Sequence, residues 1–344
     1  MNIIVTANTV PFIHGGADYH IEGLIEELKI RGHQVESIRF PFRFNPDSEL
    51  VNLMAFCESQ NYTCPNGKMV DRVISLQFPA YGVHHPSQVI WLMHQHRKAY
   101  DLYPDRPTSE QALLRDQIMD YDNRTIANAA KVYANSACVA SRLRKFNHIE
   151  SEPLYHPPHA WQHFYNQEAQ DFIFFPSRLE ELKRQDLLIE AAKYLESPVK
   201  IILGGSGGQA EAYQEMIDKF GLADRVRLIG RFSEPEKFTY YAQCLAVFFA
   251  PKDEDYGYIT LEAMLSSKPV ITCTDSGGPL EFVEDQITGY VCDPDPKEIA
   301  QAIDQLYADK EKAKAMGQAG YKKYHAANIS WDNVIETLLG PLWE

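Results

Sequence analysis

The stretch AVFFAPKDEDYGYITLEAMLSSKPVITC, residues 246–273, holds an apolar strand, a polar turn, a helical segment and a second apolar strand. Continuous apolar strands separated by helices are typical of parallel sheets that helices cover on both faces. Within this stretch, Glu254 and Glu262 lie on either side of Gly257. The stretch therefore predicts an α/β fold and places two carboxylates around the start of one helix.

The same alternation of strands and helices continues along the rest of the chain. In the clearest helical segment, Ile21, Leu24, Ile25 and Leu28 form one apolar stripe, and Gly32 follows as a stop. The apolar runs that predict strands are residues 2–7, 73–78, 89–93, 132–136, 172–175, 199–204, 226–230, 246–251 and 269–273.

The alternation breaks once, at residues 152–170, which carry three prolines and no periodicity. A break of this kind between two α/β halves predicts a hinge between domains. We therefore expect a first domain at residues 1–158 and a second at 159–327. The amphipathic segment 328–344 could return to pack on the first domain.

Length, composition and charge restrict the class of protein. The chain has 344 residues, of which 45% are hydrophobic, enough for two domains with separate cores. No run approaches the ~18 apolar residues of a membrane span, and the first residues enter a strand without a basic region. We therefore expect a cytoplasmic protein without a transmembrane segment or signal peptide.

The net charge of −14 argues against nucleic acid as a partner, because binding a phosphate backbone needs clustered Lys and Arg. About twelve of these excess negative charges fall after residue 160. The nearly neutral first half would permit contact with an anionic surface or a lipid-linked acceptor.

The cysteines are scattered and lack the paired spacing of a zinc site, which favours buried, reduced thiols over disulfides or a metal site. They are Cys57, Cys64, Cys138, Cys244, Cys273 and Cys292.

Residues after two strands of the first half are candidates for ligand binding, because open α/β sheets bind ligands at the carboxyl ends of their strands. Gly15 and Gly16 lead into the first helix, with Asp18 near its start. Adjacent glycines allow close approach to the backbone, and a helix start attracts an anion. His94 and Arg97 follow a later strand and could bind a polar or anionic group. A simple turn and a structural histidine are the competing interpretations.

In the second half, Arg178 ends a strand and Lys183 follows five positions later, at the expected start of a helix. Two cations there suit a diphosphate, whereas a salt bridge to a neighbouring glutamate is the alternative. The glycine-rich run 204–208 lacks the GxGxxG spacing of a dinucleotide site and is better interpreted as a loop that another group approaches closely.

The stretch 246–273 completes the pattern. A helix that begins near Gly257 directs the amides of Tyr258 and Ile259 toward the strand ends, where a phosphate would bind. Glu262, about one turn inside that helix, could accept two hydrogen bonds from a vicinal diol. Glu254 would lie on the other side of the phosphates.

Together, Gly15-Gly16, Arg178, Lys183, EDYGYITLEAM at 254–264 and GGPLE at 277–281 resemble the family 4 glycosyltransferases. The resemblance covers essentially the whole chain. It implies the GT-B fold, in which two Rossmann-like domains with parallel sheets face one another across a deep cleft. It also implies transfer of a sugar from a nucleotide-diphosphate donor to an acceptor hydroxyl with retention of configuration. One departure is Arg184, where family members often have Gly.

The resemblance also implies roles for single residues. Glu254 and His94 would be catalytic, Glu254 near the reacting carbon of the sugar and His94 on the sugar from the other domain. Glu262 would bind the ribose. The donor diphosphate would be held by Arg178, Lys183, Gly16, Tyr258 and Ile259. Further contacts with sugar or acceptor would come from Gly15, Asp18 and Arg97.

The implied partners are a UDP- or GDP-linked sugar and a glycan or lipid-linked acceptor. No metal and no cofactor beyond the donor is expected, and a place at the inner face of the membrane is possible by analogy. A sugar-nucleotide epimerase and a non-catalytic nucleotide-sugar binding protein remain alternatives. A dehydrogenase would need a dinucleotide fingerprint in the first turn, which the sequence lacks.

Overall fold

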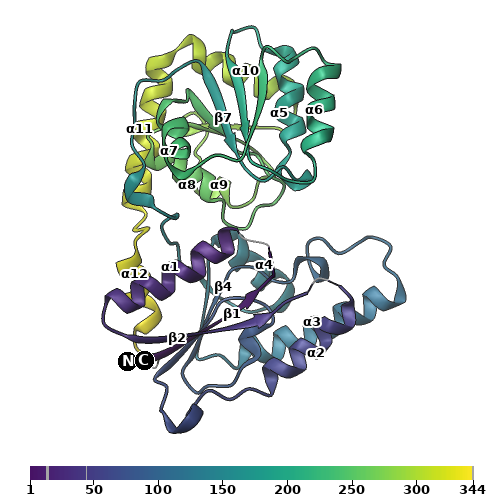
Figure 1. Cartoon of the computed structure of the whole chain (residues 1–344), viewed down its shortest axis with the longest axis vertical. Helices are drawn as coiled ribbons and strands as arrows, with labels where there is room; N and C mark the ends of the chain where they lie inside the picture. The colour runs from purple at the N-terminus through teal and green to yellow at the C-terminus, as the bar shows by residue number, and fades with distance from the viewer. Residues whose placement is uncertain (13–14, 44, 343–344) are drawn as a thin grey trace. The chain divides into compact units, whose positions relative to one another are not determined.

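The computed structural model describes residues 1–12, 15–43 and 45–342, which form two compact units (Figure 1). The first unit comprises Met1–His159 and the chain from Ser330 onward, and the second comprises Ala160–Ile329. The expected boundaries at 158/159 and 327/328 lie within two residues of these limits.

The first unit contains a parallel six-stranded sheet in the order β2-β1-β3-β4-β5-β6. Its strands are β1 (Asn2–Thr9), β2 (Gln34–Pro41), β3 (Arg72–Ser75), β4 (Gln88–Leu92), β5 (Lys131–Ala134) and β6 (Glu152–Pro153). Its helices are α1 (Gly16–Ile30), α2 (Asp47–Glu58), α3 (Ser109–Ala127), α4 (Ala137–Asn147) and α12 (Trp331–Leu339).

Alternate residues of each strand supply two cores, one on each face of this sheet. Val89 and Trp91 of β4 pack with α1 and α12, whereas Ile90 and Leu92 pack with α2, α3 and α4. Such two-sided burial explains why the strand reads as a continuous apolar run. The expected stripe on α1 is confirmed, since Ile21, Leu24 and Leu28 are buried.

The C-terminal helix α12 packs beside α1 in this unit (Figure 1). A Cβ added at Gly23 would lie 2.7 Å from the Trp331 ring, so the absence of a side chain at Gly23 permits this approach. Arg72 Nη1 donates to the Leu338 carbonyl at 2.7 Å. The C-terminal segment therefore belongs to the first unit although it follows the second in sequence.

The second unit repeats the architecture, with a parallel sheet in the order β12-β11-β10-β7-β8-β9. Its strands are β7 (Phe172–Pro176), β8 (Lys200–Gly204), β9 (Val226–Gly230), β10 (Ala246–Phe248), β11 (Val270–Cys273) and β12 (Gly289–Cys292). Its α-helices are α5 (Gln185–Ala191), α6 (Ala210–Lys219), α7 (Glu234–Gln243), α8 (Tyr258–Leu265), α9 (Pro279–Phe282), α10 (Pro296–Ala308) and α11 (Lys310–Ala326).

Both sheets confirm the predicted α/β class with parallel strands, while the arrangement across a cleft stays a prediction. Helices α5, α6, α10 and α11 cover one face of the second sheet, and α7 and α8 cover the other. Among the described residues, no helix has both the length and the apolar character of a membrane span.

All six cysteines are free, and four are buried as expected. Cys64 is exposed and Cys138 is partly exposed, so the expectation of buried thiols is wrong for these two.

Candidate active site

Helix α8 begins at Tyr258, as the sequence predicts, and Gly257 precedes it in the left-handed region with φ 84°. A Cβ at Gly257 would meet the Phe249 ring at 3.1 Å and Pro279 at 3.2 Å, so both the conformation and the packing favour glycine. The first amides of such a helix have no intrahelical acceptor, and the helix dipole is positive there. Tyr258 and Ile259 thus lie at the start of α8, the position expected for a diphosphate.

Lys183 and Glu254 form an ion pair close to this helix start. Their side chains are 20% and 21% exposed, so water reaches both. The expectation that Lys183 starts a helix is wrong: it ends a 3₁₀ turn, Glu181–Lys183, and α5 begins only at Gln185. The fold nevertheless brings together the cation and the carboxylate that the family resemblance assigns to phosphate and sugar.

Backbone hydrogen bonds hold the segment that carries Glu254 against the loop after β11. The Glu254 amide donates to the Ser276 carbonyl at 2.8 Å, and the Gly278 amide donates to the Glu254 carbonyl at 2.8 Å. A Cβ at Gly277 would lie 2.6 Å from the Glu254 carbonyl oxygen. The absence of side chains at Gly277 and Gly278 therefore allows the segment that carries Glu254 to pack closely against their backbone.

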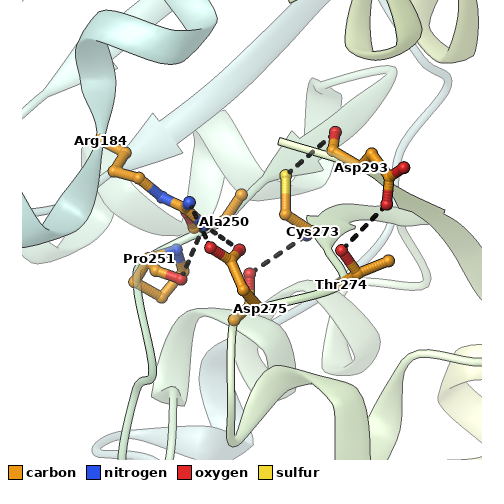
Figure 2. Close-up of polar contacts among 8 residues, drawn as sticks. Arg184, Ala250, Pro251, Cys273, Thr274, Asp275 and Asp293 are labelled. Carbon is orange, nitrogen blue, oxygen red and sulfur yellow. Dashed lines mark hydrogen bonds and ion pairs between the residues drawn. The ribbon is translucent and has the colours of Figure 1, made fainter. Parts of the chain in front are cut away.

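Arg184, which follows β7, forms hydrogen bonds with the segments that follow β10 and β11 (Figure 2). Its Nε donates to the Ala250 carbonyl at 2.7 Å and its Nη2 to the Pro251 carbonyl at 3.1 Å. Its Nη1 and Nη2 bind the two carboxylate oxygens of Asp275 at 2.9 and 2.7 Å. These bonds join the loop after β7 to the loops after β10 and β11, which carry Glu254 and its backbone partners.

Arg184 forms these contacts from a left-handed backbone conformation, with φ 57°. Glycine suits such a position, and a side chain there costs about 1–2 kcal/mol. This agrees with the departure seen in the sequence, where the family often has Gly. The hydrogen bonds of the guanidinium offset that cost.

Glu262 is buried and has partners within the protein. The Tyr241 hydroxyl donates to its Oε2 at 2.5 Å, and the Lys237 ammonium lies 3.6 Å from Oε1. Burial, followed by the Glu262 charge, raises the pKa of Tyr241, which keeps the phenol protonated and able to donate. These two contacts orient the Glu262 carboxylate, and its contact with a ribose stays a prediction.

Arg178 lies two residues after the end of β7, not at the strand end that the sequence predicts, and it is exposed. Among the described residues, its guanidinium has no hydrogen-bond or ion-pair partner, so the suggested salt bridge to Glu180 or Glu181 does not form. Its charge is available to a ligand.

The glycine-rich loop 204–208 packs against the chain that follows β7. A Cβ at Gly205 would lie 2.0 Å from the Ser177 carbonyl oxygen, and one at Gly207 would lie 2.3 Å from that of Leu179. Close approach was the predicted reason for these glycines, and the approaching group is the segment that contains Arg178.

In the first unit, the predicted residues lie at two strand ends. Gly15 precedes α1, and its amide donates to the Asp18 carboxylate at 3.0 Å. Asp18 therefore serves as a helix-capping residue, with Arg39 3.9 Å away. Arg97 binds the Asp101 carboxylate with Nε at 2.7 Å, so this charge has an intramolecular partner.

His94 follows β4 and is exposed. Its Nδ1 lies 2.7 Å from the Gln95 carbonyl oxygen. A carbonyl only accepts, so Nδ1 carries the proton and Nε2 of the neutral ring is an acceptor. No partner of Nε2 occurs among the described residues.

Sequence reasoning missed the residues that support the site, namely Arg184, Asp275, Lys237 and Tyr241. Their contacts join segments 21 to 91 positions apart, and only the departure at position 184 gave a signal.

Comparison with known proteins supports a glycosyltransferase. Residues 162–323, nearly all of the second unit, match the family model of the glycosyl transferases group 1. This match agrees with the resemblance to family 4 that the motifs carry.

Curated relatives of the chain include the alpha-1,3/1,6-mannosyltransferase ALG2. The human protein is 35% identical over 113 residues, which are 32% of this chain and 27% of that protein. The Dictyostelium discoideum protein is 27% identical over 293 residues, 73% of this chain and 69% of that protein.

Solved structures share the fold of the chain over nearly its whole length. Sucrose-phosphate synthase from Thermosynechococcus elongatus has a TM-score of 0.79 at 18% identity, covering 98% of this chain and 97% of that one. HepE from Anabaena, solved in complex with UDP-glucose, has a TM-score of 0.71 at 18% identity, covering 98% of each chain. These likenesses confirm the GT-B class.

Proposed function

We propose that the chain transfers a sugar from a UDP- or GDP-linked donor to a hydroxyl of a glycan or lipid-linked acceptor, with retention and without a metal ion. The observation that carries this proposal is the ion pair of Lys183 and Glu254 near the start of α8, within the matched family domain. In a nucleotide-diphosphate sugar, the anionic diphosphate is bonded to the carbon at which the sugar reacts. Lys183 supplies a positive charge for the diphosphate, and Glu254 supplies a negative charge for the reacting carbon.

The diphosphate would bind at the start of α8, where the dipole is positive, with Arg178 and Lys183 as counterions. Departure of the nucleoside diphosphate leaves negative charge on its terminal phosphate oxygen. Cations and helix amides that are already in place stabilise that charge without a metal. Arg178 is the cation that needs no rearrangement, because its charge has no described partner.

The sugar would lie next to Glu254. In the proposed reaction the bond from the anomeric carbon to the phosphate oxygen breaks, with its electron pair moving to the phosphate. The acceptor oxygen bonds to the same face of the carbon, and its proton passes to the departing phosphate oxygen. The Glu254 carboxylate stabilises the positive charge that the ring develops between the two events.

Glu262 is proposed to accept hydrogen bonds from the ribose, since Tyr241 and Lys237 orient its carboxylate. His94 is proposed to accept a hydrogen bond from a sugar hydroxyl through Nε2. Gly16 remains a proposed part of the phosphate site. Capping by Asp18 and pairing of Arg97 with Asp101 weaken the case for these two as ligand contacts.

The names of related proteins support the class of substrate. ALG2 is a mannosyltransferase, and HepE was solved with UDP-glucose. A place at the inner face of the membrane and the use of a lipid-linked acceptor belong to this proposal.

Purified full-length protein, incubated with UDP- and GDP-linked sugars and a panel of sugar and lipid-linked acceptors, tests the function. The proposal predicts acceptor-dependent release of a nucleoside diphosphate and a product whose anomeric configuration, read by NMR coupling constants, matches the donor. An inverted product would contradict retention. Release of an epimerised free sugar would favour the epimerase alternative, and binding without turnover of any donor would favour a non-catalytic protein.

A further inference from the structure

A pocket of about 410 Å³ lies in the first unit, apart from the residues assigned to the donor. The loop after β2, the residues after β4 and the helices α2 and α3 form its wall. Helices α2 and α3 run side by side (Figure 1), and both contribute lining residues. Its place after the carboxyl ends of two strands is the usual location of a ligand site in a parallel sheet.

The floor of the pocket is apolar. Leu50 of α2, Ala99 after β4 and Ile118 of α3 line it and are at most 3% exposed. His96 also lines it, and burial lowers the pKa of this histidine to about 4, so the ring is neutral near pH 7. A pocket of this size with an apolar floor suits the organic part of a small ligand.

Two cations from different elements line the same pocket. The Arg115 guanidinium lies 4.4 Å from the centre of the Tyr103 ring, and its Nε donates to the Ala99 carbonyl at 3.1 Å. Tyr103 and Ala99 are both lining residues, so the guanidinium itself lies in the wall. In the described part of the chain, Nη1 and Nη2 of Arg115 have no hydrogen-bond or ion-pair partner.

Lys98 is the second cation of the lining. Its side chain is exposed, and its positive charge contributes to lowering the pKa of His96. Asp47 is the single carboxylate among the lining residues. Its negative charge acts in the opposite direction and raises the pKa of His96. The lining therefore carries a net charge of about +1 in a chain whose net charge is −14.

We infer that this pocket binds a phosphate ester, with the phosphate on Arg115 and Lys98 and the organic part on the apolar floor. Guanidinium groups bind phosphate with two parallel hydrogen bonds, and Arg115 has both terminal nitrogens available. If the proposed transferase function holds, this ester is the acceptor, and the pocket narrows the acceptor to phosphorylated molecules. The organic part could come from a lipid phosphate or from a phosphorylated sugar or polyol, which share the same anion.

Calorimetry on the full chain tests the site with named probes: inorganic phosphate, a series from ethyl to hexyl phosphate, and D-inositol 3-phosphate. All titrations contain saturating UDP or GDP and are repeated in the Lys183→Gln variant, so that binding at the donor site is excluded. We expect an ester to bind at least tenfold more tightly than its alcohol. Affinity that rises about two- to fourfold per added methylene indicates a lipid phosphate, whereas preference for the inositol phosphate indicates a polyol.

Lys98→Gln and Arg115→Gln should each weaken ester binding at least fivefold. Arg124→Gln is the matched control, because Arg124 is on the same helix but pairs with Glu58 and Asp120 outside the pocket. Lys98 is exposed, so its variant keeps the test valid even if Arg115→Gln destabilises the fold. The inference is overturned if no phosphate ester binds, or if Lys98→Gln and a folded Arg115→Gln bind it like the wild type. Loss of nucleotide binding with retained ester binding would instead contradict only the proposed function.

Discussion

The Lys183 ammonium donates a hydrogen bond to the Glu254 carboxylate across 71 positions of sequence. Each residue has a predicted role with a different part of a nucleotide sugar, Lys183 with the diphosphate and Glu254 with the sugar. In this pair the two charges neutralise one another. Binding of a donor would therefore redistribute this pair, with the ammonium shared between the phosphate and the carboxylate.

Replacing Glu254 by Gln separates binding from transfer. The amide keeps the shape of the side chain but removes the charge that holds Lys183, so a diphosphate meets an unpaired ammonium. We expect nucleoside diphosphate affinity to stay equal or rise by up to about tenfold, while turnover falls at least about a hundredfold. Calorimetry and a product assay measure the two effects.

Asp171→Asn is the control for this variant, because Asp171 pairs with Lys310, away from the strand ends that form the site. Normal turnover in Glu254→Gln would remove Glu254 from the reaction.

Replacing Arg184 by Gly tests whether Arg184 positions the Glu254 loop. The change relieves the left-handed backbone but removes the bonds to Ala250, Pro251 and Asp275. We expect a net loss of about 1–3 kcal/mol in the free energy of unfolding, since hydrogen bonds to a charged group outweigh the strain. Hydrogen exchange should also accelerate in peptides that cover residues 250–257 and 275–280.

Arg225→Ala is the matched control for Arg184→Gly. Arg225 likewise donates to two backbone carbonyls, those of Leu195 and Ser197, but lies outside the site. It should destabilise the unit without faster exchange at 250–257. An Arg184→Gly variant with wild-type stability and exchange would show that the guanidinium positions nothing.

Glu262→Gln tests ribose recognition. A charged acceptor that loses its hydroxyl partners costs about 1.5–3 kcal/mol, or roughly tenfold to a hundredfold in affinity. Wild-type protein should therefore prefer the ribonucleotide over its 2′-deoxy and 3′-deoxy analogues, and Glu262→Gln should lose most of that preference. Tyr241→Phe keeps the carboxylate and should retain the preference. Equal discrimination in wild type and Glu262→Gln would rule out this role.

The buried Asp122 predicts a pH dependence of stability in the first unit. Burial raises the pKa of this carboxyl to about 7, although the Tyr81 and Tyr100 hydroxyls donate to it at 2.5 and 2.6 Å. Because the folded pKa lies above the unfolded value, the folded state holds a proton that the unfolded state releases. The stabilisation is complete below about pH 3.9 and is lost as pH rises through 7.

We expect the free energy of unfolding of the wild type to fall by up to about 4 kcal/mol between pH 4 and pH 8, relative to that of Asp122→Asn. The variant is the reference because its amide does not titrate. Parallel stability curves for the two proteins would contradict the raised pKa. Comparison with the variant cancels the opposite effect of His20 and His156, whose pKa values burial lowers and which therefore reduce stability as pH falls below 6.5.

Much of the fold was predictable because central parallel strands are buried on both faces and read as apolar runs. The edge strands β2, β6 and β12 were missed. β2, residues 34–41, has a partner on one side only and a single buried residue, Phe40, so it does not form an apolar run. β6 is only two residues long. The strand expected at 246–251 ends at Phe248, because the following residues turn toward Arg184 and α8.

The start of α8 was predictable from Gly257, whose position before an apolar helical segment is a local signal. The pairing of Lys183 with Glu254 was not, because it depends on how the loops after β7, β10 and β11 pack. Arg184 shows the limit most clearly: the sequence marks it as unusual, but only the structure shows the carbonyls and the carboxylate that it joins.

Calorimetric titration of UDP and GDP into wild-type protein, Arg178→Gln and Lys183→Gln tests the donor site most directly. The account predicts that the wild type binds at least one of the two nucleotides, and that each variant weakens this binding at least tenfold. Lys310→Gln, whose charge pairs with Asp171, should bind like the wild type. Absence of binding to either nucleotide, or unchanged affinity in both Arg178→Gln and Lys183→Gln, would contradict a donor site at the start of α8.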